Sequence, residues 1–269
     1  SDEFYNTRNR ETKSITLNEN LCSSIYYYLI NNKYEVVKSN NTTLLMYERD
    51  YNKIVSLDLN GKSITDLTGI SNFTNLEKLV LSNNTKLSNI NDLNNLKKLK
   101  ILNMNNDQLG GNVSKIFDIT SLEELYLDGN KLTSNMLNNI NKLTNLNTLS
   151  LSNNNLNTLS QLSNLSNLKI LLVNKNSIKD ISGISNLKLD KFSMESNNIS
   201  ISSPDMEISL PSVIKDVKTN GSLVYSSDNY ELVNCSVNDG KLVVDEEGKI
   251  AKVTVKGGNA DKTVFTYTN

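Results

Sequence analysis

The sequence has no histidine and no tryptophan, and among its 269 residues there are only two prolines and two cysteines. Without imidazole, a Ser-His-Asp or Cys-His catalytic centre and a histidine-based zinc site are excluded. Cys22 and Cys235 lie far apart in the chain and form no Cys-x-x-Cys pair. We therefore expect two separate thiols that pack as small hydrophobic groups, and neither a metal site nor a cofactor.

The chain also lacks an excess of charge of either sign and any long apolar run. It carries 28 basic and 29 acidic residues, a net charge of −1. Binding to a phosphate backbone needs clustered lysine and arginine, so we expect no nucleic-acid partner. No run of 18 apolar residues occurs, so we expect no insertion into a membrane. The sequence starts at Ser1 without a visible signal peptide, which indicates a processed or trimmed N-terminus.

Asparagine and leucine dominate what is present, with 46 and 39 residues, nearly a third of the chain. They recur in the pattern L-x-x-L-x-L-x-x-N-x-L, and successive copies start 22, 23, 23, 24, 22 and 21 residues apart. So regular a period predicts an α/β repeat solenoid, a right-handed leucine-rich-repeat horseshoe over residues 53–200. The seven copies start at Ile54, Leu76, Leu99, Leu122, Leu146, Leu168 and Leu189.

The asparagine of each copy follows the strand, where the chain turns. Its side chain can both donate to and accept from turn backbone groups that would otherwise be buried unpaired. Asp107 takes this position in the third copy and cannot donate when ionised, and Lys62 in the first cannot accept. We therefore expect the first copy to lean on the segment before it. The stacked ladder should contain Asn84, Asn130, Asn154, Asn176 and Asn197.

Short return segments connect one strand to the next. They are rich in serine and asparagine and have room for only a turn or two of 3₁₀- or α-helix. The longest, around Met136 to Leu143, has room for a true helical turn. The two ends of such a stack must be closed, because no single repeat buries its own apolar face.

Residues 1–52 are predicted to form a helical cap. Leu21, Ile25 and Leu29 lie on one face of a helix over residues 17–30, with Asn18 as its N-cap. Residues 43–51 are predicted to form a second short helix. The run Tyr26, Tyr27, Tyr28 is expected to pack within the cap, with contact to a partner as the alternative.

Residues 201–269 follow a different pattern. Pro204 and Pro211 mark the change, after which valine, threonine and tyrosine alternate with polar residues. The spacing predicts a small β-sandwich that shares a core with the last repeat. Its strands are expected at residues 222–227, 230–237, 240–245, 249–257 and 263–268.

In this order of parts the chain resembles the internalin-type surface proteins of Gram-positive bacteria. The stretches ITDLTGISNFTNLEKLVLSNN (64–84), DISGISNLKLDKFSMESNNIS (180–200) and LPSVIKDVKTNG (210–221) carry the likeness. The resemblance implies a helical cap, roughly 22-residue repeats and a fused immunoglobulin-like domain. It also implies a secreted or wall-attached virulence protein that adheres to a host protein or glycan. The signal peptide and anchor are expected outside this sequence.

A ligand of such a protein is expected on the concave sheet, where the residues between the buried strand positions face outward. Several of these residues are apolar, and exposed apolar patches often mark partner sites, although such residues also simply suit strands. The predicted ligand-binding residues are Lys78, Val80, Ile101, Asn103, Glu124, Tyr126, Ser150, Ile170, Leu172 and Lys191.

The leading functional hypothesis is thus a monomeric recognition module that is not an enzyme. A structural spacer of the cell envelope without its own ligand is the alternative, and a regulator of an intracellular enzyme is a third. No calcium loop, phosphate-binding glycine loop or nucleophile elbow occurs. The acidic run Asp245 to Glu247 falls in an expected hairpin turn, where it is simply solvated. Catalytic residues are therefore not predicted.

Overall fold

The computed structural model describes residues 11–211, 229–238 and 240–268. The chain divides into two compact units, Ser1–Asn130 and Lys131–Asn269. The expected strand over residues 222–227 lies outside the described residues.

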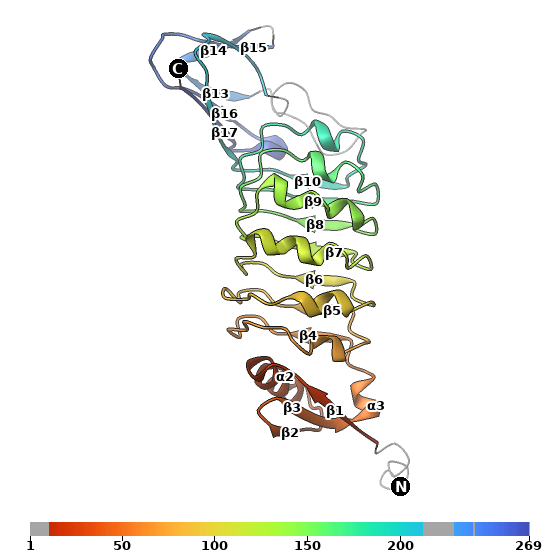
Figure 1. Cartoon of the computed structure of the whole chain (residues 1–269). Coiled ribbons are helices and arrows are strands. Elements are labelled where there is room, and N and C mark those ends of the chain that lie inside the picture. The colour runs from red at the N-terminus through yellow and green to blue at the C-terminus, as the bar shows by residue number, and fades with distance from the viewer. Residues whose placement is uncertain (1–10, 212–228, 239, 269) are drawn as a thin grey trace. The chain divides into compact units, whose positions relative to one another are not determined.

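The first unit begins with a small α/β cap (Figure 1). Its helix α2 (Glu19–Asn31) begins where predicted: the Asn18 side chain accepts hydrogen bonds from the backbone N–H groups of Asn20 and Leu21, at 3.1 and 3.2 Å. Such an N-cap satisfies donors that the first turn leaves unpaired. Leu21, Ile25 and Leu29 are fully buried on one face, as the spacing predicted.

The prediction of a second helix in the cap, over residues 43–51, is wrong. Residues Thr43–Tyr47 form strand β3, and only Glu48–Tyr51 form a short helix, α3. The period-two burial of Leu44 and Met46 explains the strand, because alternate residues of a strand face one side. β3 pairs antiparallel with β1 (Thr12–Thr16) and β2 (Val36–Asn40) in the order β1-β3-β2. The cap is therefore a helix packed on a three-stranded sheet rather than a purely helical one.

Repeats follow the cap in the first unit. Their strands β4 (Ser56–Asp58), β5 (Lys78–Val80), β6 (Ile101–Asn103) and β7 (Glu124–Tyr126) pair in parallel, in chain order (Figure 1). The return segments contain the 3₁₀-helices η2 (Ile70–Asn72), η3 (Asn91–Asn95) and η4 (Gly110–Ile116). Short 3₁₀ turns of this kind were predicted from the segment lengths.

The second unit continues the repeat with β8 (Thr148–Ser150), β9 (Ile170–Leu172) and β10 (Lys191–Ser193), again parallel. The helical turn expected between Met136 and Leu143 is absent from this described segment. Two 3₁₀-helices, η5 (Ser134–Leu137) and η6 (Ile140–Lys142), take its place. η7 (Ser160–Leu162) and η8 (Ser182–Ile184) complete the return segments of this unit.

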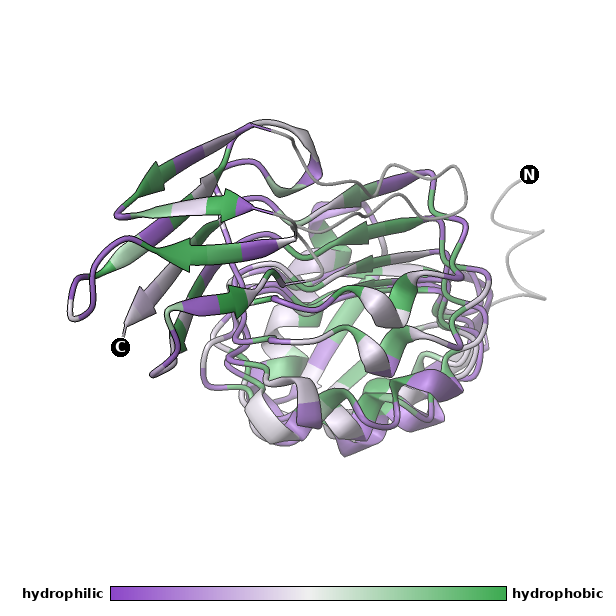
Figure 2. Ribbon diagram, turned by 90° about the horizontal axis from the view of Figure 1, so that it is seen from above, coloured by the Kyte–Doolittle hydropathy of each residue, from purple (hydrophilic) through white to green (hydrophobic). Residues whose placement is uncertain are grey.

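Within each unit, leucines from strands and return segments make the core (Figure 2). The central residue of every repeat strand is buried, as Leu79, Leu125 and Leu171 illustrate with no exposed surface. Apolar residues of the return segments, such as Ile70 and Leu162, are equally buried. Burial of this apolar surface from both sides of each coil is the main stabilising force of the fold.

The predicted asparagine ladder is confirmed in both units. Asn84 Oδ1 accepts from the N–H of Lys62 and Ile64, at 3.1 and 2.9 Å, and its Nδ2 donates to the carbonyl oxygens of Leu59 and Leu81, at 3.0 and 2.7 Å. In the second unit, Asn154, Asn176 and Asn197 accept in the same way from Leu132, Leu156 and Ile178. The first repeat does contact the segment before it, as predicted, because Asn20 Nδ2 of the cap donates to the carbonyl of Ser63 at 2.7 Å.

Two sheets follow the repeats in the second unit. The first contains β11 (Asn198–Ser202), β17 (Val264–Thr268), β16 (Ala251–Val255) and β13 (Tyr230–Val233). The second contains β12 (Glu207–Ser209), β15 (Lys241–Val244) and β14 (Cys235–Asn238). The single strand expected over residues 230–237 divides at Asn234, whose φ of 56° is left-handed and breaks the extended backbone. An immunoglobulin-like topology stays a prediction.

The last repeat and these sheets share backbone contacts. Thr263, fully buried, accepts from the N–H of Asn197 at 3.2 Å and donates to the carbonyl of Met194 at 3.1 Å. These are the two bonds that the next asparagine of the ladder would supply. Met194 N–H also donates to the carbonyl of Asn259, at 2.8 Å. The chain thus closes its repeat stack with residues 259–264 in place of another repeat.

Candidate functional site

The geometry of the repeat strands decides which side chains face away from the core. Each strand has three residues, and its buried middle residue leaves the first and third on the opposite face. We call these positions the first face in the first unit and the second face in the second unit. The first face contains Lys78, Val80, Ile101, Asn103, Glu124 and Tyr126, and the second contains Ser150, Ile170, Leu172 and Lys191.

Apolar and polar side chains alternate on the first face. The parallel register places Ile101 between Lys78 and Glu124, and Asn103 between Val80 and Tyr126. Neighbouring strands lie about 4.8 Å apart, so Ile101 has a polar neighbour on either side, and Val80 and Tyr126 share Asn103 as a polar neighbour. Val80, Ile101 and Tyr126 are half-buried, whereas Lys78 is exposed. The structure therefore brings all six predicted residues of this unit together on one face.

Tyr126 is held in place by its own strand. Its hydroxyl donates to Glu124 Oε1 at 2.7 Å. Burial and the neighbouring Glu124 carboxylate raise the pKa of Tyr126 to about 12, so the phenol stays neutral. An oriented tyrosine with few rotatable bonds loses little entropy on contact with a partner, which is one reason such residues anchor interfaces.

The second face is smaller than predicted. Ile170 and Leu172 are half-buried on β9, and Lys191 is exposed on β10. The prediction that Ser150 faces a ligand is wrong, because only 2% of its surface is exposed. Ser150 pairs in register with Leu172 of the next strand.

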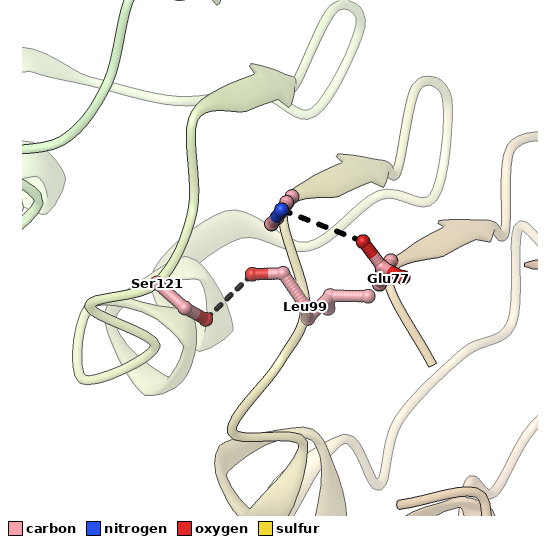
Figure 3. Close-up of polar contacts among 4 residues, drawn as sticks. Glu77, Leu99 and Ser121 are labelled. Carbon is pink, nitrogen blue, oxygen red and sulfur yellow. Dashed lines mark hydrogen bonds and ion pairs between the residues drawn. The ribbon is translucent and has the colours of Figure 1, made fainter. Parts of the chain in front are cut away.

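Polar contacts between consecutive repeats hold the residues just before the strands in place. Ser121 donates its hydroxyl to the carbonyl of Leu99 at 2.5 Å (Figure 3). Lys100 Nζ lies 3.4 Å from Glu77 Oε1, an exposed pair of small energetic value. The backbone N–H groups of Lys100 and Ile101 donate to the carbonyl of Glu77, at 2.8 and 2.9 Å. A rigid scaffold of this kind presents the first face in one arrangement.

Asp92 organises the return segments of the first unit, a role that was not predicted from the sequence. Asp92 Oδ2 accepts hydrogen bonds from the N–H groups of Gly69 and Ser71 and from the Ser71 hydroxyl, at 2.9, 3.1 and 2.8 Å. These bonds lower the pKa of Asp92 against the raising effect of its burial, the largest single contribution. The feature of the sequence that could have identified Asp92 is its position near the start of a return segment, one repeat period after Gly69.

Both cysteines are buried free thiols, as expected from their separation in the chain. Burial raises the pKa of each thiol, which keeps the reactive thiolate scarce. Among the described residues, no group of three or more histidine, cysteine, aspartate or glutamate side chains could hold a metal ion. No described helix has the length and apolar character needed to cross a bilayer.

Known proteins share this repeat. Residues 43–154 match the family model of the leucine-rich-repeat domain of the endo-β-N-acetylglucosaminidase EndoS. A leucine-rich-repeat protein of Leptospira interrogans is 30% identical to this chain, with a TM-score of 0.50. The matched region is 56% of this chain and 39% of the Leptospira protein. The sequence finds no match among curated proteins.

Internalins of Listeria monocytogenes are also similar. Internalin C2 is 26% identical and covers 68% of this chain and 89% of its own, with a TM-score of 0.49. InlP is 15% identical, with coverages of 93% and 95% and a TM-score of 0.44.

Repeats, ladder and parallel strands define this chain as a leucine-rich-repeat protein. The repeats are similar to those of internalins, the family that the sequence resembles. The immunoglobulin-like domain that the resemblance also implied stays a prediction.

Proposed function

We propose that this protein is an extracellular recognition module of a bacterium, which binds a host protein through an exposed face of its repeats, the first face or the second. The observation that carries the proposal is the set of half-buried apolar side chains on these faces. Val80, Ile101 and Tyr126 occupy the first, and Ile170 and Leu172 the second. Apolar groups left at a surface are stabilised when a partner covers them.

The charges around these apolar groups support a protein partner. Lys78 is exposed beside Ile101 on the first face, and Lys191 is exposed beside Ile170 on the second. A polar rim around an apolar centre is the usual anatomy of protein interfaces and orients the partner during encounter. Binding then involves no covalent step, and the protein acts as a monomer at the cell surface or after secretion.

Binding to cultured epithelial cells, measured by flow cytometry with the labelled chain, tests this proposal. Tyr126→Ala probes the first face and Leu172→Ala the second. Val37→Ala is the matched control, because Val37 is an apolar residue of β2 with 61% of its surface exposed and lies on neither face. Thermal unfolding of each variant verifies that the fold is intact.

We expect at least a tenfold loss of affinity in one face variant and unchanged binding in the control. A single central anchor removed from an interface commonly has an effect of this size. Binding that survives both face variants would contradict the proposal. Failure of the intact chain to bind any cells would favour a spacer of the cell envelope.

A further inference from the structure

The first unit has a second surface feature, a groove of about 600 Å³ between α2 and the loop that follows β4. Ser23 and Ser24 of α2 line it. The other lining side chains include Tyr27, Tyr28, Asn31, Asp58, Asn60 and Lys62.

An aromatic platform forms one wall of the groove. Tyr27 has 59% of its surface exposed, although its neighbours in α2 are buried or half-buried. Its ring makes an edge-to-face contact with the ring of Tyr26, with centroids 5.3 Å apart and planes at 68°. This contact fixes the orientation of the Tyr27 ring and leaves a face free for an apolar patch of a ligand.

Unused polar groups surround this platform. Asp58 Oδ1 accepts from the N–H of Asn60, and within the described part of the chain Asp58 Oδ2 has no hydrogen-bond donor. Asn60 Oδ1 accepts from the Ser82 hydroxyl and from Asn83 Nδ2, each at 2.8 Å, which orients Asn60 and leaves its amide N–H groups as donors. Among the described residues, none pairs with the side chains of Asn31 and Lys62.

The backbone edge beside the groove is closed. Ser56 lies in β4, the outer strand of the first unit's repeats, and the hydroxyl of Tyr28 donates to the Ser56 carbonyl at 3.2 Å. An extended peptide that added a strand to a sheet would need such carbonyl groups free. The groove is therefore suited to side-chain recognition rather than to strand addition.

The charges of the groove also narrow the class of ligand. Asp58 disfavours an anionic ligand, and Lys62 disfavours a cationic one. Neutral hydroxyl groups can both donate and accept, so they suit a lining in which carboxylate, amide and ammonium groups are mixed. A ligand with hydroxyl groups at its rim and an apolar C–H face would also cover the Tyr27 ring.

We infer that the groove between α2 and the loop after β4 binds a neutral oligosaccharide. A pyranose ring stacks on Tyr27, while its hydroxyl groups bind Asp58, Asn60 and Asn31. This site borders the first face, because Asp58 pairs in register with Val80, but its aromatic platform Tyr27 lies on α2 and is not part of that face.

Saturation-transfer NMR on the whole chain tests this inference. The probes are chitotriose, N-acetyllactosamine, maltotriose and mannotriose, each at millimolar concentration. We expect at least one to bind, and Tyr27→Ala and Asp58→Ala each to weaken that binding at least tenfold. Tyr34→Phe and Tyr126→Ala serve as controls, because both positions lie outside the lining of the groove, and binding should be unchanged in them.

Three results would overturn the inference. The first is the absence of binding by all four saccharides to a chain whose fold is intact. The second is binding that persists in both Tyr27→Ala and Asp58→Ala, which would place the sugar elsewhere. Binding of an unstructured peptide to the same groove in place of any saccharide would also contradict it. A protein partner bound at the first face responds to Tyr126→Ala instead, so the two proposals fail separately.

Discussion

At the scale of single residues, Asp107 is the most unusual member of the ladder. It is fully buried, and its Oδ1 accepts from the N–H of Asn84 at 2.8 Å. Its Oδ2 is buried without a hydrogen-bond partner among the described residues. Burial raises the pKa of Asp107 to about 7, against the lowering effect of the Asn84 N–H. The carboxyl therefore takes up a proton more readily in the folded chain than in the unfolded one.

We expect the free energy of unfolding to fall as pH rises from about 4, the carboxyl pKa of an unfolded chain, through 7. Below that range Asp107 is neutral in both states and makes its full contribution to stability. Asp107→Asn restores a neutral donor, so the variant should be more stable at pH 8 by about 1–3 kcal/mol. Urea unfolding at pH 5 and pH 8 measures both effects. Equal loss of stability with pH in the variant and the parent chain would contradict this account.

A left-handed residue precedes the ladder position in every repeat. The position is glycine at Gly61 and Gly129, with φ of 62° and 67°, whereas Lys175 has φ of 54°. A side chain costs about 1–2 kcal/mol in this conformation, and glycine gives back part of that as chain entropy.

Lys175→Gly should therefore raise the free energy of unfolding by about 0.5–1 kcal/mol. The control is Lys169→Gly, at an exposed position without a positive φ, which should lower it. Urea midpoints of the two variants compare them directly. A loss of stability in both would show that the left-handed backbone carries no strain at Lys175.

At the scale of the elements, the closure of the repeats by Thr263 makes a specific prediction. Thr263→Val keeps the shape of the side chain but leaves Asn197 N–H and the Met194 carbonyl without their bonds to its hydroxyl. The Met194 carbonyl keeps its bond from Asn197 Nδ2 at 2.8 Å, but the buried Asn197 N–H loses its partner. Such a loss costs about 1–3 kcal/mol, so the variant should lose that much stability in urea unfolding. Thr263→Ser retains the hydroxyl and should keep most of it. Equal losses in the two variants would mean that the methyl group matters instead.

The start of α2 offers a second prediction at this scale. Asn18→Ala removes the oxygen that accepts from Asn20 and Leu21, and the loss of such a cap costs about 1 kcal/mol. Asn18→Asp keeps an acceptor and should be nearly neutral. Thermal unfolding followed by circular dichroism measures the difference. A cap replacement without effect would show that tertiary contacts alone fix the beginning of this helix.

An element could be predicted from the sequence where residues close together in the chain determine it, and could not where distant residues do. The strands and the ladder repeat with one period, so leucine and asparagine spacing was enough to place them. β3 was misread as helix because Thr43–Tyr47 is a short apolar run, which periodicity alone cannot assign. This segment forms a strand because it pairs with β1, which lies more than 25 residues earlier in the chain. The burial of Ser150 likewise could not be predicted from the spacing of residues along its own strand.

At the scale of the whole molecule, the sequence was a better guide to the cap, the repeats and the C-terminal sheets than to the candidate binding surfaces. The first face could be found from strand periodicity, since every repeat contributes to it by the same rule. The groove beside α2 could not, because it joins Tyr27 to Asp58, residues that meet only when the cap folds against the first repeat. The proposed recognition would thus depend on residues that the repeat period leaves variable.

Site-specific photo-crosslinking on cultured cells tests the central claim, recognition through the repeat faces, most directly. A photoreactive phenylalanine analogue replaces Asn103 on the first face in one chain and exposed Lys97 in a return segment in another. We predict that the analogue at position 103 crosslinks to one cell-surface protein, which excess unlabelled chain displaces, and that the analogue at position 97 does not. Equal crosslinking from both positions, or crosslinking from position 97 alone, would contradict the claim.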